Sequence, residues 1–119
     1  MKTLLINPFT QTITEHEFDG SLSSMYALLQ CSTVEGVYVD DEGSPLFDGE
    51  NILFVDKEGL LCNLQEQAFF VINGKPIAGR AMTMNCDSHG ETIESTVTLQ
   101  DLISKVEWAT LELLRDSYA

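Results

Sequence analysis

The sequence predicts an α+β fold in which a mostly antiparallel sheet of hairpins carries two packed helices. Short apolar segments of strand length alternate with turn residues, and two segments instead repeat apolar residues at helical spacing. The predicted order is β-β-α-β-β-β-β-α, and its short connections favour hairpins and hence antiparallel pairing. A chain of 119 residues has the length of one domain, so we predict a single domain over residues 1–119.

The first part of the chain predicts a hairpin followed by a short helix. Residues 2–7 and 12–19 are strand-like segments on either side of a proline-containing turn. Ser21 is then placed to cap a helix over Leu22–Gln30, where apolar residues recur at helical spacing.

The middle of the chain predicts two more strands. Residues 33–40 alternate, with Val37 and Val39 on one face, and residues 51–56 form an apolar strand bounded by turn signals. Residues 60–67 fit either a short strand or a helical turn.

Residues 68–84 predict the clearest hairpin. An apolar run turns at Asn73–Gly74 and continues past Pro76 as a second strand. Gly79 inside that strand marks a bulge or a close backbone approach. We expect a loop over residues 85–92.

The last predicted element is a helix of about four turns that begins at Thr98, with Asp101 at the third helical position. Its apolar stripe comprises Leu99, Leu102, Ile103, Val106, Ala109, Leu113 and Leu114. Trp108 falls off this stripe, so we interpret it as a candidate interface residue.

Negative charge is the outlying property of the composition. The chain has 19 acidic and 6 basic residues and a net charge of −13, and residues 35–66 hold nine of the acids with one base. Contacts to phosphate need lysine and arginine, so direct binding to nucleic acid or to an anionic membrane is disfavoured. A basic protein partner fits this charge, and a role in solubility is the alternative.

The cysteines and the apolar runs indicate a compartment. Cys31, Cys62 and Cys86 are odd in number and widely spaced, which is typical of a protein in a reducing cytosol. The apolar runs are of strand length, and the N-terminal segment lacks the pattern of a signal peptide. We therefore predict a cytoplasmic protein.

The motifs for metal and catalytic chemistry are incomplete. A calcium loop that opened at Asp40 would need glycine and glutamate where the chain has Pro45 and Asn51. Cys86 and His89 have the spacing of half a zinc site, without a second paired motif. We predict no catalytic residue, no metal site and no cofactor, and we interpret "VDDEG" and "VDKEG" as turns at strand ends.

Three stretches of the chain resemble a known family. They are "LLINPFTQTITEHEFDGSLSSMYALLQC", "ILFVDKEGLL" and "FFVINGKPIAGRAM", which together cover most of residues 3–84. They resemble small phage- and plasmid-borne proteins catalogued as a domain of unknown function. Asp56, Glu58 and Gly59 match the acidic turn of that family, with Lys57 at a position where an acid is frequent; Pro76, Ala78 and Gly79 match its hairpin. The resemblance implies a mobile-element origin in a bacterial cytoplasm and no particular reaction.

We expect a non-enzymatic binding protein of a phage or mobile element that acts on a basic host protein. In its sharper form, the carboxylates would mimic nucleic acid and inhibit a defence protein. The candidate partner-binding residues are Asp40, Asp41, Glu42, Asp48, Glu50, Asp56, Glu58 and Trp108. Two alternatives remain open: a small metal-dependent enzyme that uses the acidic turns, and a structural homodimer formed through Trp108 and its helix. The chain would be a monomer or a homodimer.

Overall fold

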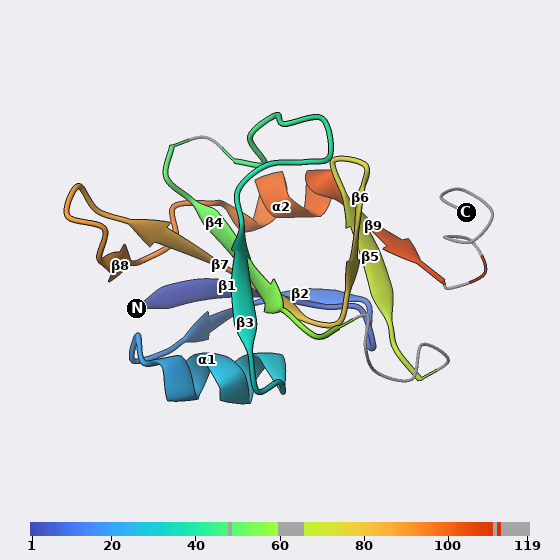
Figure 1. Cartoon of the computed structure of the whole chain (residues 1–119), viewed down its shortest axis with the longest axis horizontal. Coiled ribbons are helices and arrows are strands. Elements are labelled where there is room, and N and C mark those ends of the chain that lie inside the picture. Colours follow the sequence, from blue (N-terminus) through green and yellow to red (C-terminus); the bar gives the residue numbers. More distant parts are fainter. Residues whose placement is uncertain (48, 60–65, 111, 113–119) are drawn as a thin grey trace.

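Two antiparallel sheets and two helices make up the fold, and the helices lie on opposite sides of the larger sheet (Figure 1). The structure is a computed structural model that describes residues 1–47, 49–59, 66–110 and 112. All strand pairings in this part of the chain are antiparallel. The prediction of an α+β fold with a mostly antiparallel sheet is confirmed.

The larger sheet has six strands in the order β2-β1-β7-β4-β3, with β8 paired to β7. Its N-terminal hairpin forms as the sequence predicts, with Lys2 opposite Glu17 and Asn7 opposite Thr12. The strands are β1 (Lys2–Asn7), β2 (Thr12–Glu17), β3 (Val34–Val37), β4 (Ile52–Asp56), β7 (Ala81–Cys86) and β8 (Thr92–Ile93).

The smaller sheet has three strands in the order β6-β5-β9. They are β5 (Phe69–Ile72), β6 (Lys75–Ala78) and β9 (Val106–Ala109). Asn73 and Gly74 both have positive φ and connect β5 to β6, as their turn signal predicts. Within the part of the chain that the structure describes, both β3 and β6 are therefore edge strands.

Two hydrophobic cores cover the two faces of the larger sheet. Strand side chains alternate between faces, so Leu4 and Ile6 enter one core while Leu5 enters the other. The core between the sheets joins strands of both sheets to helix α2 (Leu99–Lys105) through Leu102. The partly buried Trp108 packs against this core. The second core packs helix α1 (Leu22–Leu29) against the opposite face. Burial on both faces explains why β1 is a continuous apolar run.

Both helices begin at the residues that the sequence predicts. The Ser21 hydroxyl oxygen accepts a hydrogen bond from the N–H of Ser24, and the Thr98 hydroxyl oxygen accepts one from the N–H of Asp101, both at 3.1 Å. Each bond satisfies an N–H group that has no partner within its helix.

The predicted four-turn helix at the C-terminus is wrong. Helix α2 ends at Lys105, and Val106–Ala109 forms β9, which pairs with the whole of β5. β-Branched and aromatic side chains favour strand geometry, and the edge of β5 supplies backbone partners. Trp108 therefore lies opposite Phe70 in a sheet. Leu113 and Leu114 lie outside the described residues.

The predicted hairpin over residues 68–84 is wrong in its second strand, which divides between the two sheets. β6 pairs with β5, whereas β7 pairs with β1 and β4. The chain changes sheet at Gly79, whose φ of +86° is left-handed and whose N–H donates to the carbonyl of Ala68 at 2.8 Å.

Two predictions remain to be compared with the structure, those for residues 85–92 and for residues 60–67. The loop expected over residues 85–92 is in part a hairpin, because Asn85 and Cys86 belong to β7 and pair with β8. Of the ambiguous segment 60–67, residues 60–65 lie outside the described part of the chain.

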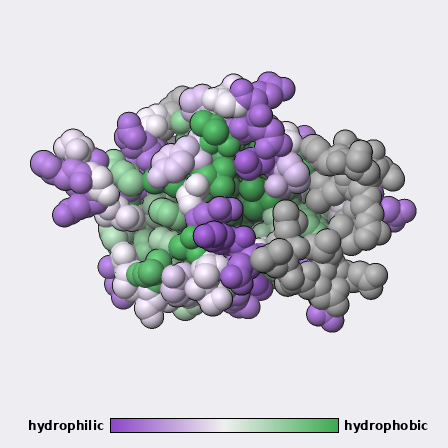
Figure 2. All heavy atoms as spheres, viewed as in Figure 1, coloured by the Kyte–Doolittle hydropathy of each residue, from purple (hydrophilic) through white to green (hydrophobic). Residues whose placement is uncertain are grey.

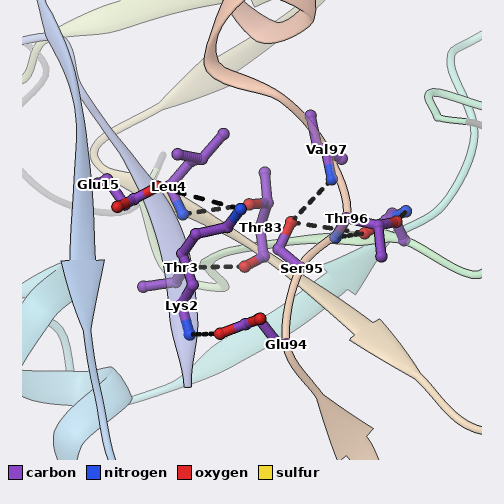
Figure 3. A network of polar contacts seen from close by, with 10 residues as sticks. Lys2, Thr3, Leu4, Glu15, Thr83, Glu94, Ser95, Thr96 and Val97 are labelled. Atoms are coloured by element: carbon purple, nitrogen blue, oxygen red, sulfur yellow. Dashed lines mark hydrogen bonds and ion pairs between the residues drawn. The ribbon is translucent and has the colours of Figure 1, made fainter.

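A buried polar network joins β1, β7 and the segment before α2 (Figure 3). The Thr3 hydroxyl donates to the carbonyl of Thr83 at 2.7 Å, and the Thr83 hydroxyl accepts from the N–H of Leu4 at 3.2 Å. Both threonines are fully buried. Ser95 continues the network, because its hydroxyl accepts from the N–H of Val97 at 3.3 Å and its N–H donates to the carbonyl of Lys2.

Candidate functional site

The first acidic stretch is a turn built on the Asp40 side chain. Its Oδ1 accepts hydrogen bonds from the N–H groups of Glu42 and Ser44, both at 2.9 Å. The N–H of Asp40 donates to the carbonyl of Ser44, and Gly43 adopts a φ of +84°. The Asp40 carboxylate therefore stabilises the backbone of this turn through hydrogen bonds. The interpretation of this stretch as a turn is confirmed.

Asp87 builds the same turn at the end of β7. Its Oδ1 accepts from the N–H groups of His89 and Glu91 at 2.9 and 3.0 Å, and Gly90 has a φ of +79°. The structural counterpart of "DDEGS" is therefore "DSHGE". The spacing of Cys86 and His89 follows from this turn.

The second acidic stretch turns differently. The Oδ1 of Asp56 accepts from the N–H of Glu58 at 2.9 Å, and the N–H of Gly59 donates to the carbonyl of Asp56 at 3.2 Å. Gly59 lies against β6, because a Cβ built on it would approach the carbonyl oxygen of Ala78 to 2.7 Å. Any larger residue would push this turn away from the smaller sheet.

The two acidic turns lie at opposite ends of the β3–β4 ladder. Val34 is opposite Asp56 and Val37 is opposite Leu53, so Asp40 follows one end of the ladder and Asp56 closes the other. Their carboxylates do not meet at one point. Glu35, which is exposed, lies between them along β3.

The remaining predicted site residues divide into four groups. Asp41 forms an ion pair with Lys75 at 3.4 Å. Glu42, Glu50 and Glu58 are exposed. Trp108 is half-buried against the core between the sheets and has a structural role there. Asp48 lies outside the described residues.

A groove of about 440 Å³ lies between the two edge strands β3 and β6. Val37, Val55 and Ile77 line it with apolar side chains, and Glu35, Asp56, Lys57 and Lys75 add charges. Figure 2 shows apolar surface in the middle of the visible face with polar groups around it. The volume is within the range of ligand-binding clefts.

Contacts between the sheets close both ends of this groove. The ion pair of Asp41 with Lys75 joins the acidic turn to the start of β6. At the other end, Gly59 packs against Ala78 at the end of β6. β3 and β6 therefore run in opposite directions along the two sides of the groove.

Two exposed apolar residues extend the groove toward the first acidic turn. Tyr38 is 59% exposed and Val39 is 41% exposed, and both line the groove. The alternation of residues 33–40 places Val39 on the same face as Val37 and assigns no role to Tyr38. Both residues lie beyond the end of β3 at Val37, a boundary that the alternation of residues 33–40 does not show.

One comparison with known proteins identifies the family. The model of the family described as "Domain of unknown function (DUF3846)" matches residues 1–107. The chain belongs to the DUF3846 family. No significant match is found among curated proteins or among solved structures.

Two motifs of this DUF3846 chain meet at the groove. The second acidic turn, which begins at Asp56, contributes Asp56 and Gly59. The β5–β6 hairpin contributes Pro76 and Ala78. They are separate in sequence, and the contact of Gly59 with Ala78 brings them together. The family description names no activity, so the geometry of this groove is the basis for a functional proposal.

A second hollow of about 650 Å³ in the DUF3846 fold lies beside Cys31, with Tyr26, Asp56 and Glu58 around it. Burial raises the pKa of the Cys31 thiol, and the negative charge of Asp56 raises it further. Both effects favour the neutral thiol, which is the weaker nucleophile.

The described residues contain neither a metal-binding cluster nor a membrane-spanning helix. No group of three or more His, Cys, Asp or Glu side chains there has an arrangement that could hold a metal ion. No helix in the same part of the DUF3846 chain is long and apolar enough to cross a membrane.

Proposed function

We propose that this protein is a small acidic binding protein that captures a basic protein partner. One observation carries the proposal: exposed Tyr38 and Val39 line the groove and lie directly before the acidic turn of Asp40, Asp41 and Glu42. Aromatic and apolar groups supply the core of protein interfaces, and surrounding charges steer the encounter and select the partner.

The net charge of −13 determines which partners fit. Like charge repels acidic proteins and nucleic acid, whereas a lysine- or arginine-rich surface gains from association. Asp56 lies at one end of the β3–β4 ladder, Glu35 lies within β3, and Asp40 follows the other end. This arrangement supports the sharper form of the proposal, in which the partner offers a groove that otherwise holds nucleic acid. The proposal includes a mobile-element origin and action in a bacterial cytoplasm.

Capture from bacterial lysate tests the proposal when it is done with matched variants. The triple variant Asp40→Asn, Asp41→Asn and Glu42→Gln removes three charges, and an asparagine at position 40 keeps the Oδ1 acceptor that builds the turn. We expect basic proteins to be enriched on the wild-type protein, and their capture at low salt to fall by about tenfold or more on the triple variant.

The control removes the same number of charges from exposed sites outside both the acidic turn and the groove: Glu91→Gln, Glu107→Gln and Glu112→Gln. Capture should be close to wild type for this control and should fall for Tyr38→Ala at any salt concentration. The proposal fails if no basic protein is enriched, or if both charge variants lose capture equally.

A further inference from the structure

We propose that the open edge of β3 is a strand-addition site, where an extended basic segment of the partner pairs antiparallel with β3 inside the groove. The inference rests on the proposed function and names its binding mode. Edge strands carry backbone groups that a new strand can bind, and peptide recognition by strand addition uses them.

The hydrogen-bond pattern shows which backbone groups of β3 point to its unpaired edge. The N–H of Lys57 donates to the carbonyl of Thr33 at 3.3 Å, so these two residues form a hydrogen-bonded pair of the ladder. Such pairs alternate along antiparallel strands, and Glu35 and Val37 therefore also point their backbone groups at β4. Val34 and Gly36 therefore point theirs away from β4, toward the unpaired edge of β3, and Gly36 is among the residues that line the groove.

The opposite wall of the groove offers fewer backbone groups to an added strand. The N–H of Gly79 donates to the carbonyl of Ala68, so the same alternation directs Pro76 and Ala78 away from β5 and toward the groove. Proline has no N–H to offer, and the carbonyl of Ala78 is covered by Gly59. An incoming strand therefore finds its backbone partners on β3.

Side chains around the groove indicate the composition of that strand. Val37, Val55 and Ile77 offer an apolar surface to one face of an inserted strand. Six carboxylates border β3 and its two ends, against two lysines, one of which already pairs with Asp41. The carboxylates belong to Glu35, Asp40, Asp41, Glu42, Asp56 and Glu58.

Charge complementarity therefore favours a segment that alternates apolar residues with lysine or arginine. A second copy of this chain would bring another −13 to the same edge, so it is the less favourable occupant.

A synthetic peptide that alternates lysine with valine is a direct probe. Two further versions carry N-methyl groups on every lysine or on every valine, which leaves charge and side chains unchanged and blocks one backbone edge each. Strand addition uses only one backbone edge of the peptide. We therefore expect one methylated version to bind like the parent and the other to bind at least about tenfold more weakly. Bound peptide should also slow the hydrogen exchange of the Val34 and Gly36 amides, measured by NMR.

Gly36→Pro gives a second measurement, because it removes an N–H at the unpaired edge of β3, a position where proline is tolerated. A Cβ at this position comes within 3.1 Å of Ile52, so thermal unfolding must first show that the variant is folded. The methylated peptides keep the test decisive if it is not.

The outcomes separate the inference from the proposed function. If all three peptides bind equally, or if the parent peptide does not bind while basic proteins are still captured from lysate, strand addition is wrong and the proposed function stands. If no basic protein is captured, the proposed function itself is wrong.

Discussion

Single hydroxyl groups hold the larger sheet together where its ladder is incomplete. Ladder pairs between β1 and β7 are confined to Leu5 with Met82 and Ile6 with Ala81. Beyond them the hydroxyls of Thr3 and Thr83 supply the bonds between the strands. A buried N–H without a partner costs free energy, so these hydroxyls are structural.

We predict that Thr83→Val destabilises the fold although the two side chains have nearly the same shape. The substitution leaves the buried N–H of Leu4 without its acceptor, which costs about 1–3 kcal/mol. Urea unfolding followed by circular dichroism measures the change in the free energy of unfolding. Thr14→Val on exposed β2 is the matched control and should change stability by less than about 0.5 kcal/mol. Equal effects of the two variants would contradict a structural role for the Thr83 hydroxyl.

At this scale the sequence predicts local contacts and misses distant ones. The turns at Asp40 and Asp56 are predictable because each aspartate binds N–H groups two to four residues away. The bond between Thr83 and Leu4 joins residues 79 positions apart, and no local pattern marks it.

Helix α1 shows how one element is fixed by the residues just before it. The Oδ1 of Asp19 accepts from the N–H of Ser21 at 2.8 Å. The hydrogen bond from the Ser21 side chain is the main cause that lowers the pKa of the Asp19 carboxyl to about 2. Ser21 therefore caps the helix and also stabilises the ionised form of Asp19.

We predict two effects of Ser21→Ala. The loss of the cap should lower the free energy of unfolding by about 1 kcal/mol, whereas Ser23→Ala on the exposed face of α1 should leave it nearly unchanged. The pKa of Asp19, followed by NMR titration, should rise from about 2 toward 3.8. Because the folded-state pKa is lowered, the stabilisation by Asp19 is present above pH 3.8 and is lost as the pH falls through about 2. An unchanged pKa in the variant would contradict the assignment of its cause.

The element that the sequence mispredicts is the one that depends on a distant partner. Residues 106–109 continue the apolar spacing of α2, so local pattern alone extends the helix. Their backbone instead pairs with Phe69–Ile72, more than thirty positions earlier in the chain. Tertiary pairing overrides helical periodicity in such a segment, since Val106 and Trp108 suit a strand at least as well.

The groove depends on how the two sheets are arranged in the whole molecule. Its walls are edge strands of two different sheets, and its ends are closed by Asp41 with Lys75 and by Gly59 with Ala78. Turn and strand patterns predict each of these segments separately. Their meeting depends on the change of sheet at Gly79, which local pattern presents as a feature within one strand. The net charge, in contrast, is known from composition alone, and the structure shows that Glu35 and Asp56 line the groove.

The excess of negative charge should make stability depend on salt. At about 10 mM salt the screening length is about 30 Å, and at 150 mM it is about 8 Å. The longest dimension of the molecule is 41 Å, so at low salt most carboxylates repel one another across the fold. We predict that the midpoint of thermal unfolding rises by a few degrees when sodium chloride increases over this range.

Paired variants of opposite sign test the cause of this salt effect. Glu42→Gln with Glu58→Gln removes two exposed negative charges and should raise the unfolding midpoint at low salt, with a smaller gain at 150 mM. Lys57→Gln removes a positive charge from the same region and should lower the midpoint at low salt, again with a smaller effect at 150 mM. Changes of the same sign in both variants, or changes that salt does not reduce, would mean that local contacts dominate over the net charge. The predicted pattern would show that the acidic segment costs stability, which is the expected consequence if its charge serves the capture of a basic partner.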